Sequence, residues 1–185
     1  LVDQKTKTPL GLPISVDVPR VNALDFDRSS NLLVAGTGYG TIMLIDSYQQ
    51  TKTKLTGLEM DEIVSVQFTD DRSIVAVDAV GHIGIWRPHG QTFKLARDFW
   101  TTDGLTAASV SQNGEALALG DGWGKIHLYS VSSGKKVSSL HAHVGIIHGL
   151  AWDIAGSRLA SAGADGSAGV WSFKGLSPLI SPRGK

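Results

Sequence analysis

The chain repeats itself four times at a spacing of 42 residues, and this feature limits the possible folds more than any other. The copies begin at Val21, Ile63, Leu105 and Ile147. Each copy carries a large aliphatic residue (Leu33, Val75, Leu117, Leu159) and then a glycine (Gly40, Gly81, Gly124, Gly166), with one residue fewer between them in the second copy. Self-similarity at a fixed period of this length indicates that each copy is one structural unit of a repeat architecture.

Apolar and polar residues alternate within each copy, as in a β-strand with one buried face. Three alternating stretches are separated by short turns rich in Gly, Ser, Asp and Asn, and a weaker fourth stretch follows at TKLTGL, TFKLAR and KKVSSL. None of these stretches has the period of a helix. Four short strands per copy describe one blade of a propeller. We predict blades at residues 21–58, 63–98, 105–140 and 147–181.

The amino-acid composition argues against several classes of function. Lys+Arg and Asp+Glu balance at 17 each, so no overall charge attracts the chain to nucleic acid or to a membrane surface. There are no cysteines, which excludes disulfides and cysteine-bound metals and fits a reducing compartment, so we expect a cytoplasmic protein. No apolar stretch is long enough to span a membrane, and residues 1–20 contain no apolar segment like that of a signal peptide.

The stretch LGDGWGKIHLYS, residues 119–130, contains glycines and a lysine of the kind that occur in phosphate-binding loops. A P-loop has four residues between its glycines, a Ser or Thr after its lysine, and then a helix. Here three residues separate Gly120 from Gly124, Ile126 follows Lys125, and the next element is predicted to be a strand. The stretch is therefore predicted to be a turn, and we expect neither a nucleotide nor another cofactor.

The fourth copy, HAHVGIIHGLAWDIAGSRLASAGADGSAGVWS, resembles a repeat of the WD40 family. It has the family's His before the first strand, Ser in the second, Asp-Gly in the turn and Trp in the third. The resemblance implies an all-β propeller of four-stranded antiparallel blades. It also implies that one hydrogen-bonded tetrad ties the fourth blade together, made by His143, Ser161, Asp165 and Trp171. Because a buried imidazole and a carboxylate can satisfy each other, we expect the His143–Asp165 pair to be buried.

The first three copies depart from this pattern. They carry Tyr39, Val80 and Trp123 where the fourth carries Asp165. These blades are therefore expected to depend on packing rather than on a tetrad.

In the fold that the resemblance implies, the turns between second and third strands lie on the same face as the connections between blades. That face would carry Trp123, Trp100 and Tyr39, with Asp61, Glu62, Asp78 and Asp103 on or near its rim. Exposed aromatic residues are the usual hot spots of protein interfaces, and an acidic rim favours a basic partner. Two interpretations stay open at this point. Either these residues bind a partner, or the tryptophans pack against neighbouring blades and the carboxylates are ordinary solvated loop charges.

We predict a non-catalytic scaffold that docks another protein on this face. The chain has no cysteine nucleophile, no GxSxG motif and no pair of carboxylates that stands apart from the repeats. One alternative is a sensor segment of a multidomain, NTPase-linked regulator. Another is a propeller enzyme with a metal held by His141, His143 and His148, although the repeat already gives His143 a structural partner.

Four copies are too few for the disc of about seven blades that the resemblance implies, so we expect residues 1–185 to form a partial propeller. Further blades, from the same polypeptide or from a second chain, would complete this arc. Residues 13–18 (PISVDV) would be the outer strand of a preceding blade, and residues 176–181 (LSPLIS) the outer strand of the fourth.

Overall fold

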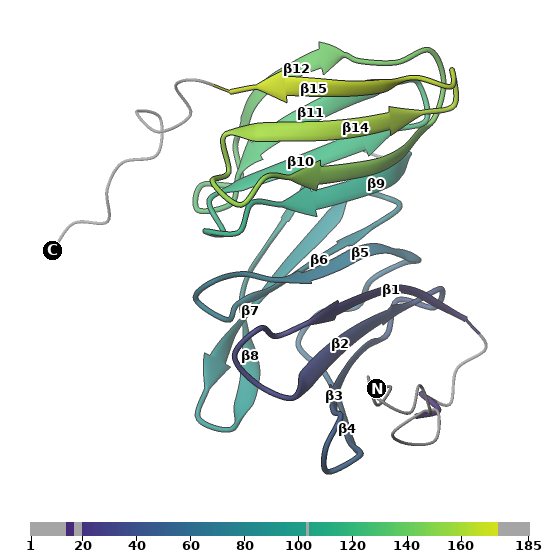
Figure 1. The fold of residues 1–185 in the computed structure, drawn as a ribbon. Helices are drawn as coiled ribbons and strands as arrows, with labels where there is room; N and C mark the ends of the chain where they lie inside the picture. Colours follow the sequence, from purple (N-terminus) through teal and green to yellow (C-terminus); the bar gives the residue numbers. More distant parts are fainter. Residues whose placement is uncertain (1–13, 17–19, 103, 174–185) are drawn as a thin grey trace, which may run out of the picture.

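The computed structural model describes residues 14–16, 20–102 and 104–173, in which fifteen β-strands form four separate antiparallel sheets. Strands that are neighbours in a sheet are also neighbours along the chain, so each sheet is a simple meander. The sheets follow one another as blades (Figure 1), and no helix occurs in the described ranges. The predicted all-β, four-bladed propeller fold is confirmed.

Each blade corresponds to one sequence copy. Blade 1 contains β1 (Val21–Phe26), β2 (Leu32–Thr37), β3 (Ile42–Asp46) and β4 (Thr51–Lys54). Blade 2 contains β5 (Ile63–Phe68), β6 (Ile74–Asp78), β7 (His82–His89) and β8 (Thr92–Trp100). Blade 3 contains β9 (Leu105–Val110), β10 (Ala116–Asp121), β11 (Lys125–Ser130) and β12 (Lys136–His141). Blade 4 contains β13 (Ile147–Trp152), β14 (Arg158–Gly163) and β15 (Ala168–Ser172).

The two terminal strands that the sequence predicted are not established. Residues 14–16 form no strand, and the other residues of the predicted strand 13–18 lie outside the described ranges. The predicted outer strand of blade 4, residues 176–181, also lies outside them. Blade 4 therefore has three strands in the part of the chain that the structure describes.

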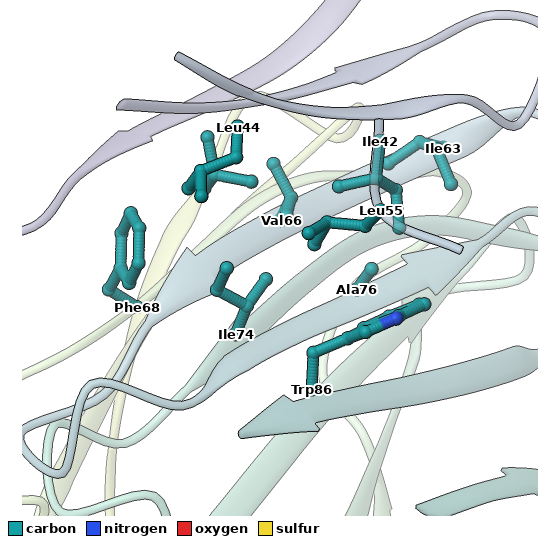
Figure 2. Close-up of a cluster of buried hydrophobic side chains, with 10 residues drawn as sticks. Ile42, Leu44, Leu55, Ile63, Val66, Phe68, Ile74, Ala76 and Trp86 are labelled. Atoms are coloured by element: carbon teal, nitrogen blue, oxygen red, sulfur yellow. The ribbon is translucent and has the colours of Figure 1, made fainter. Parts of the chain in front are cut away.

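The hydrophobic core lies between the blades. Blades 1 and 2 bury a cluster that includes Ile42 and Leu44 from the first and Ile74 and Trp86 from the second (Figure 2). A similar cluster lies between blades 2 and 3, and another between blades 3 and 4. Because both faces of a middle blade are covered, its central strands are apolar on both sides. In β6 all five residues are buried.

The sequence alignment placed the one-residue deletion of the second copy between its second and third strands. In the structure the shorter turn is the one between the first and second strands, β5 and β6. Phe68 pairs with Ile74, as Phe26 pairs with Leu33, so Ile74 and not Val75 is the equivalent of Leu33. The turn after β5 closes with the Thr69 N–H donating to the carbonyl of Ser73, four residues on. The corresponding bonds in the other three blades span five residues.

A shift of one residue changes the face of a strand side chain, because strand side chains alternate. Ile74 accordingly packs toward blade 1, whereas Val75 packs toward blade 3. The shortened turn places Arg72 in the left-handed region with φ 61°, where the equivalent Gly114 has φ 70°. From this position the Arg72 Nε donates to Asp27 Oδ2 of blade 1 at 2.8 Å.

Polar contacts between inner strands recur from blade to blade. The Phe68 N–H donates to Asp25 Oδ2 and the Val110 N–H to Gln67 Oε1, each at 2.7 Å. The equivalent side chain on blade 4 is Ala151, which has no acceptor to offer. On blade 1 the equivalent N–H, that of Phe26, donates to Asp25 Oδ1 at 2.9 Å. Both ends of the arc therefore lack the polar link that joins blade 1 to blade 2 and blade 2 to blade 3. Blades 3 and 4 are joined differently, by the Trp152 Nε1 that donates to the Ser109 carbonyl at 3.0 Å.

The two end blades each leave an apolar face uncovered by other described residues. On blade 1, Leu24 is 61% and Phe26 51% exposed, whereas their equivalents Val66 and Phe68 on blade 2 are buried. On blade 4, Val170 is 71% exposed, and three alanines of the same face are exposed as well: Ala160, Ala162 and Ala168. Within the described ranges, β13 does not pack against β1 as successive inner strands pack on one another. The four blades form an open arc.

Candidate protein-interaction face

One face of the arc is built from the turns between the second and third strands and from the connections that lead to the next blade. We call it the loop face; it comprises turns 38–41, 79–81, 122–124 and 164–167, the last residue of β8 (Trp100), and the described residues of the connections, 55–62, 101–102, 104 and 142–146. Hydrogen bonds join these segments directly. The Thr101 N–H donates to the Gly81 carbonyl, and the Ala142 N–H to that of Gly124. The turns of blades 2 and 3 are thus held against the connections that leave their own blades.

The glycines of these turns permit this close approach. Gly124 has φ 84°, and a β-carbon there would lie 1.9 Å from the His143 carbonyl oxygen. Gly81 has φ 88° and would meet the Thr102 carbonyl oxygen at 2.1 Å. Only glycine combines a left-handed backbone with so close a contact. The glycines around Lys125 therefore shape a turn, as the sequence predicted.

Large apolar side chains are concentrated on the loop face. Tyr39 is 69%, Trp123 64% and Trp100 63% exposed, so none of the three is buried between blades. Three aliphatic side chains of the same face are also exposed: Val80, Val144 and Ile146. Trp123 contacts Gly104, and Trp100 directly precedes the same connection. The partner-binding role of these residues stays a prediction.

The acidic residues that were predicted on the rim lie in different environments. Asp78 was expected at the partner-binding surface, but it is buried, because its carboxylate ends β6 and accepts hydrogen bonds from two backbone groups. These are the His82 N–H at 2.7 Å and the Asp61 N–H at 3.0 Å. Asp103 lies outside the described residues. Asp61 and Glu62 lie in connection 55–62 of the loop face.

The four residues of the implied tetrad form one hydrogen-bonded chain in blade 4. Ser161 Oγ lies 2.7 Å from His143 Nε2 and accepts from Trp171 Nε1 at 2.8 Å. His143 Nδ1 lies 3.1 Å from Asp165 Oδ1. The expectation that both residues of the His143–Asp165 pair are buried is wrong for Asp165. His143 is buried, but the Asp165 side chain is 22% exposed because it lies in the turn between β14 and β15. The backbone N–H of Val144 and the Ser167 side chain and N–H hold the pKa of Asp165 well below its usual value.

Removing the central hydroxyl of this chain should destabilise blade 4. Ser161→Ala leaves the buried His143 and the Trp171 indole without a shared partner, and we expect the free energy of unfolding to fall by about 1–3 kcal/mol. Urea unfolding of the two proteins measures the difference. Ser172→Ala, on the exposed end of β15, is the matched control and should change stability by less than about 0.5 kcal/mol. Equal stability of Ser161→Ala and the parent would contradict the tetrad's contribution.

Blades 2 and 3 contain His–Asp pairs of their own, which the sequence analysis missed. In blade 3, His127 Nε2 lies 2.9 Å from Asp121 Oδ2, and both residues are buried. In blade 2, the buried His82 lies with its Nε2 3.0 Å from Asp98 Oδ2. Blades 2 and 3 therefore add a His–Asp pair to the packing on which they were expected to depend. In blade 3 the available signal was the aspartate at the end of the second strand, followed by a histidine six residues later; in blade 2 the pair joins residues 16 apart on β7 and β8, and no short spacing marks it.

Comparison with known proteins identifies this architecture. The family model of the WD domain, G-beta repeat, matches residues 134–172, the segment that contains the tetrad. The chain is also 32% identical over 86 residues to an uncharacterized WD repeat-containing protein of Schizosaccharomyces pombe. Residues 134–172 therefore match a WD40 repeat, and the chain resembles WD-repeat proteins. The match covers 46% of this chain and 14% of the yeast relative, so the chain spans a small part of that protein's length.

A solved structure shows the same arrangement of blades. The crystal structure of the computationally designed Ika4 protein superposes with a TM-score of 0.69, covering 89% of this chain and all of the designed one. The sequence identity is 20%, so the likeness concerns the fold alone. WD40 propellers are typical protein-interaction scaffolds and are generally not enzymes. No helix in the described ranges is long and apolar enough to cross a membrane.

The histidines of the alternative metal site are not gathered around one point. His143 engages both ring nitrogens in the WD40 tetrad, while His141 ends β12 and His148 lies exposed on β13. Among the described residues, no group of three His, Cys, Asp or Glu side chains could hold a metal ion.

A depression of about 390 Å³ opens among the turns that follow the inner strands, at the strand ends opposite the loop face. Two of its carboxylates already accept hydrogen bonds, Asp27 from Ser29, Ser30 and Arg72, and Asp153 from Ser157 and Arg158. These carboxylates stabilise turns of blades 1 and 4.

Proposed function

We propose that the chain is a non-catalytic scaffold that docks a partner protein on its loop face. The observation that carries this proposal is the set of exposed apolar side chains gathered there: Tyr39, Val80, Trp100, Trp123, Val144 and Ile146. Large exposed apolar side chains gathered on one face favour a protein–protein contact. Tyrosine and tryptophan are also the residue types that contribute most binding energy in such contacts.

The backbone that presents these side chains is held in place before binding. Asp121 Oδ1 accepts from the Trp123 N–H and the Lys125 N–H, each at 2.9 Å, which fixes the turn that carries Trp123. In blade 1 the Thr37 hydroxyl accepts from the Tyr39 and Thr41 N–H groups in the same way. A rigid turn loses little conformational entropy on association, so more of the contact energy is available for affinity.

The experiment compares exposed aromatic residues on and off the loop face. Trp123→Ala should weaken partner association by more than about 1 kcal/mol while the melting temperature stays nearly unchanged. Tyr48→Ala is the control, because Tyr48 is 83% exposed in the turn between β3 and β4, at the strand ends opposite the loop face. Proteins recovered with tagged parent and variant chains from cells of the source organism are quantified by mass spectrometry. Equal recovery with Trp123→Ala and the parent would contradict the proposal.

We further propose that the uncovered faces of blades 1 and 4 are covered by additional propeller blades. The exposed residues on these faces are apolar, and their equivalents in blades 2 and 3 are buried against a neighbouring blade. An additional blade would therefore bury these side chains as blades 2 and 3 bury their equivalents. Because Ala151 offers no acceptor and Phe26 N–H is already paired, contact at these ends is expected to be apolar rather than through the polar link that joins blade 1 to blade 2 and blade 2 to blade 3.

Solution behaviour of the chain tests this second proposal. The chain alone should self-associate or aggregate in light scattering, because its end faces expose apolar side chains to water. Phe26→Ser should reduce this association, whereas Tyr48→Ser should leave it unchanged. A cooperatively melting monomer of 19.6 kDa would contradict the need for further blades.

A further inference from the structure

Trp100 forms a fixed aromatic platform on the loop face. Its indole stacks on the imidazole of His82 with a centroid distance of 4.0 Å and an interplanar angle of 8°. Stacking covers one face of the indole, yet the residue is 63% exposed, so the opposite face is open to solvent. The supporting ring is itself held, because His82 is buried and bonded through Nε2 to Asp98.

A partly free carboxylate lies beside this platform. Asp98 and Trp100 are two residues apart on β8, and alternate residues of a strand point to the same side. Asp98 Oδ2 is engaged by His82, whereas Oδ1 makes no hydrogen bond to the described residues, and the side chain is 44% exposed. The neighbouring Arg97 does not neutralise it, since its guanidinium donates to the Ser132 and Ser133 carbonyls of blade 3.

The adjoining connection adds negative charge. Leu58 lies so close to Gly84, the register partner of Asp98, that a β-carbon on Gly84 would meet its side chain. Connection 55–62 therefore runs along this edge of blade 2, and it contains Glu59, Asp61 and Glu62 but no basic residue. Glu62 is paired with Arg20, which leaves Glu59 and Asp61 without a basic partner among the described residues.

We propose that Trp100 and Asp98 bind an arginine or lysine side chain of the partner protein. The cation would lie over the open face of the indole, which attracts positive charge through its electron-rich surface, and would pair with the free Asp98 oxygen. This inference rests on the proposed function and adds the chemical class of the partner: a basic segment. Trp123 lacks these features, because Lys125 follows two residues later and repels a second cation.

Short peptides of defined charge test the inference on the whole chain. The probes are Ac-Gly-Arg-Gly-Arg-Gly-amide and the matched peptide in which glutamine replaces both arginines. We expect the arginine peptide, and not the glutamine peptide, to shift the Trp100 indole N–H resonance of the ¹⁵N-labelled protein. Added salt should weaken the interaction, because part of the attraction is between exposed charges.

Three variants assign the interaction to the platform. Trp100→Ala should weaken binding of the arginine peptide by about fivefold or more, and Asp98→Asn, which keeps the shape but loses the charge, by about threefold or more. Tyr48→Ala, which removes an exposed aromatic ring at the strand ends opposite the loop face, should leave binding within about twofold. Equal shifts with both peptides, or unchanged binding by Trp100→Ala and Asp98→Asn, would overturn the inference.

The result is separable from that of the docking experiment. If Trp123→Ala loses the cellular partner but the arginine peptide does not bind at Trp100, the docking function stands and the basic partner class is wrong. If the arginine peptide binds at Trp100 as expected while loop-face variants keep every cellular partner, the cation site stands and the docking function is wrong.

Discussion

Trp86→Ala is expected to lower the free energy of unfolding by about 3–5 kcal/mol, which is typical when a large aromatic side chain is removed from a core. Trp86 is only 1% exposed and is the largest fully buried side chain described. Its indole lies over Gly84, where a β-carbon would come within 2.4 Å of the ring, and its Nε1 donates to the Thr56 carbonyl at 2.9 Å. The substitution therefore leaves a cavity between blades 1 and 2 and removes the anchor of connection 55–62.

Chemical denaturation of Trp86→Ala and Trp123→Ala measures this effect against a matched control. Both remove an indole, but Trp123 is 64% exposed, so its loss should change stability by less than about 0.5 kcal/mol. Gly84→Ala should also destabilise the parent, because the new methyl group would collide with the ring. In the Trp86→Ala background that added cost should largely disappear. Equal stability of the two tryptophan variants would contradict the assigned core.

Asp121→Ala is expected to cost about 3–5 kcal/mol, the range for breaking a buried, paired charge. The Asp121 carboxylate accepts from the Trp123 and Lys125 N–H groups and faces His127 Nε2, so its removal leaves these groups without a partner. Asp121→Asn keeps an oxygen for the two backbone donors and should lose less. A loss below about 1 kcal/mol for Asp121→Ala would show that water replaces the carboxylate without cost.

The contribution of Asp121 should also depend on pH. Burial raises the pKa of Asp121, but hydrogen bonds from His127 and from the backbone N–H groups of Lys125 and Trp123 outweigh burial and lower the pKa below 3.8. The carboxylate therefore stabilises the fold above that pH, and the stabilisation is lost as pH falls through the lowered pKa. Asp121→Asn should make the free energy of unfolding less sensitive to pH in the acidic range.

The sequence was sufficient to predict the fold because each blade repeats the same alternation of apolar and polar residues. The tetrad of blade 4 was also accessible, since its residues occupy the positions that the WD40 resemblance implies. The exposure of Trp100 and Trp123 was not decided by the sequence. A tryptophan at a turn can either cover a neighbouring blade or remain in solvent, and the local amino-acid sequence is the same in both cases.

Two errors concerned the positions of individual side chains. Placing the deletion of the second copy after Val75 gave that residue the role of Ile74, because spacing alone does not show which turn is shorter. Asp78 was assigned to the surface because it stands at the start of a loop. In the structure, a carboxylate at a strand end turns inward to accept the N–H groups of its own turn and of the neighbouring connection.

The His–Asp pairs of blades 2 and 3 could not be found by searching for the family tetrad. Blade 4 places its carboxylate inside the turn, at Asp165, and its histidine before the first strand. Blade 3 places the carboxylate at the end of β10 and the histidine on β11. The His–Asp pairs of different blades are thus made by residues at different positions of the repeat. A search for the sequence pattern of blade 4 therefore does not find the pair of blade 3.

Position-specific photo-crosslinking in the source organism tests the loop face most directly. A photoreactive phenylalanine analogue is placed at Val80 or Val144 on the loop face, or at Tyr48 or Ile154 at the opposite strand ends, all of which are exposed. Our account predicts a crosslinked partner protein of the same identity from positions 80 and 144, and none from positions 48 and 154. Adducts confined to positions 48 and 154, or no adduct at positions 80 and 144, would contradict it.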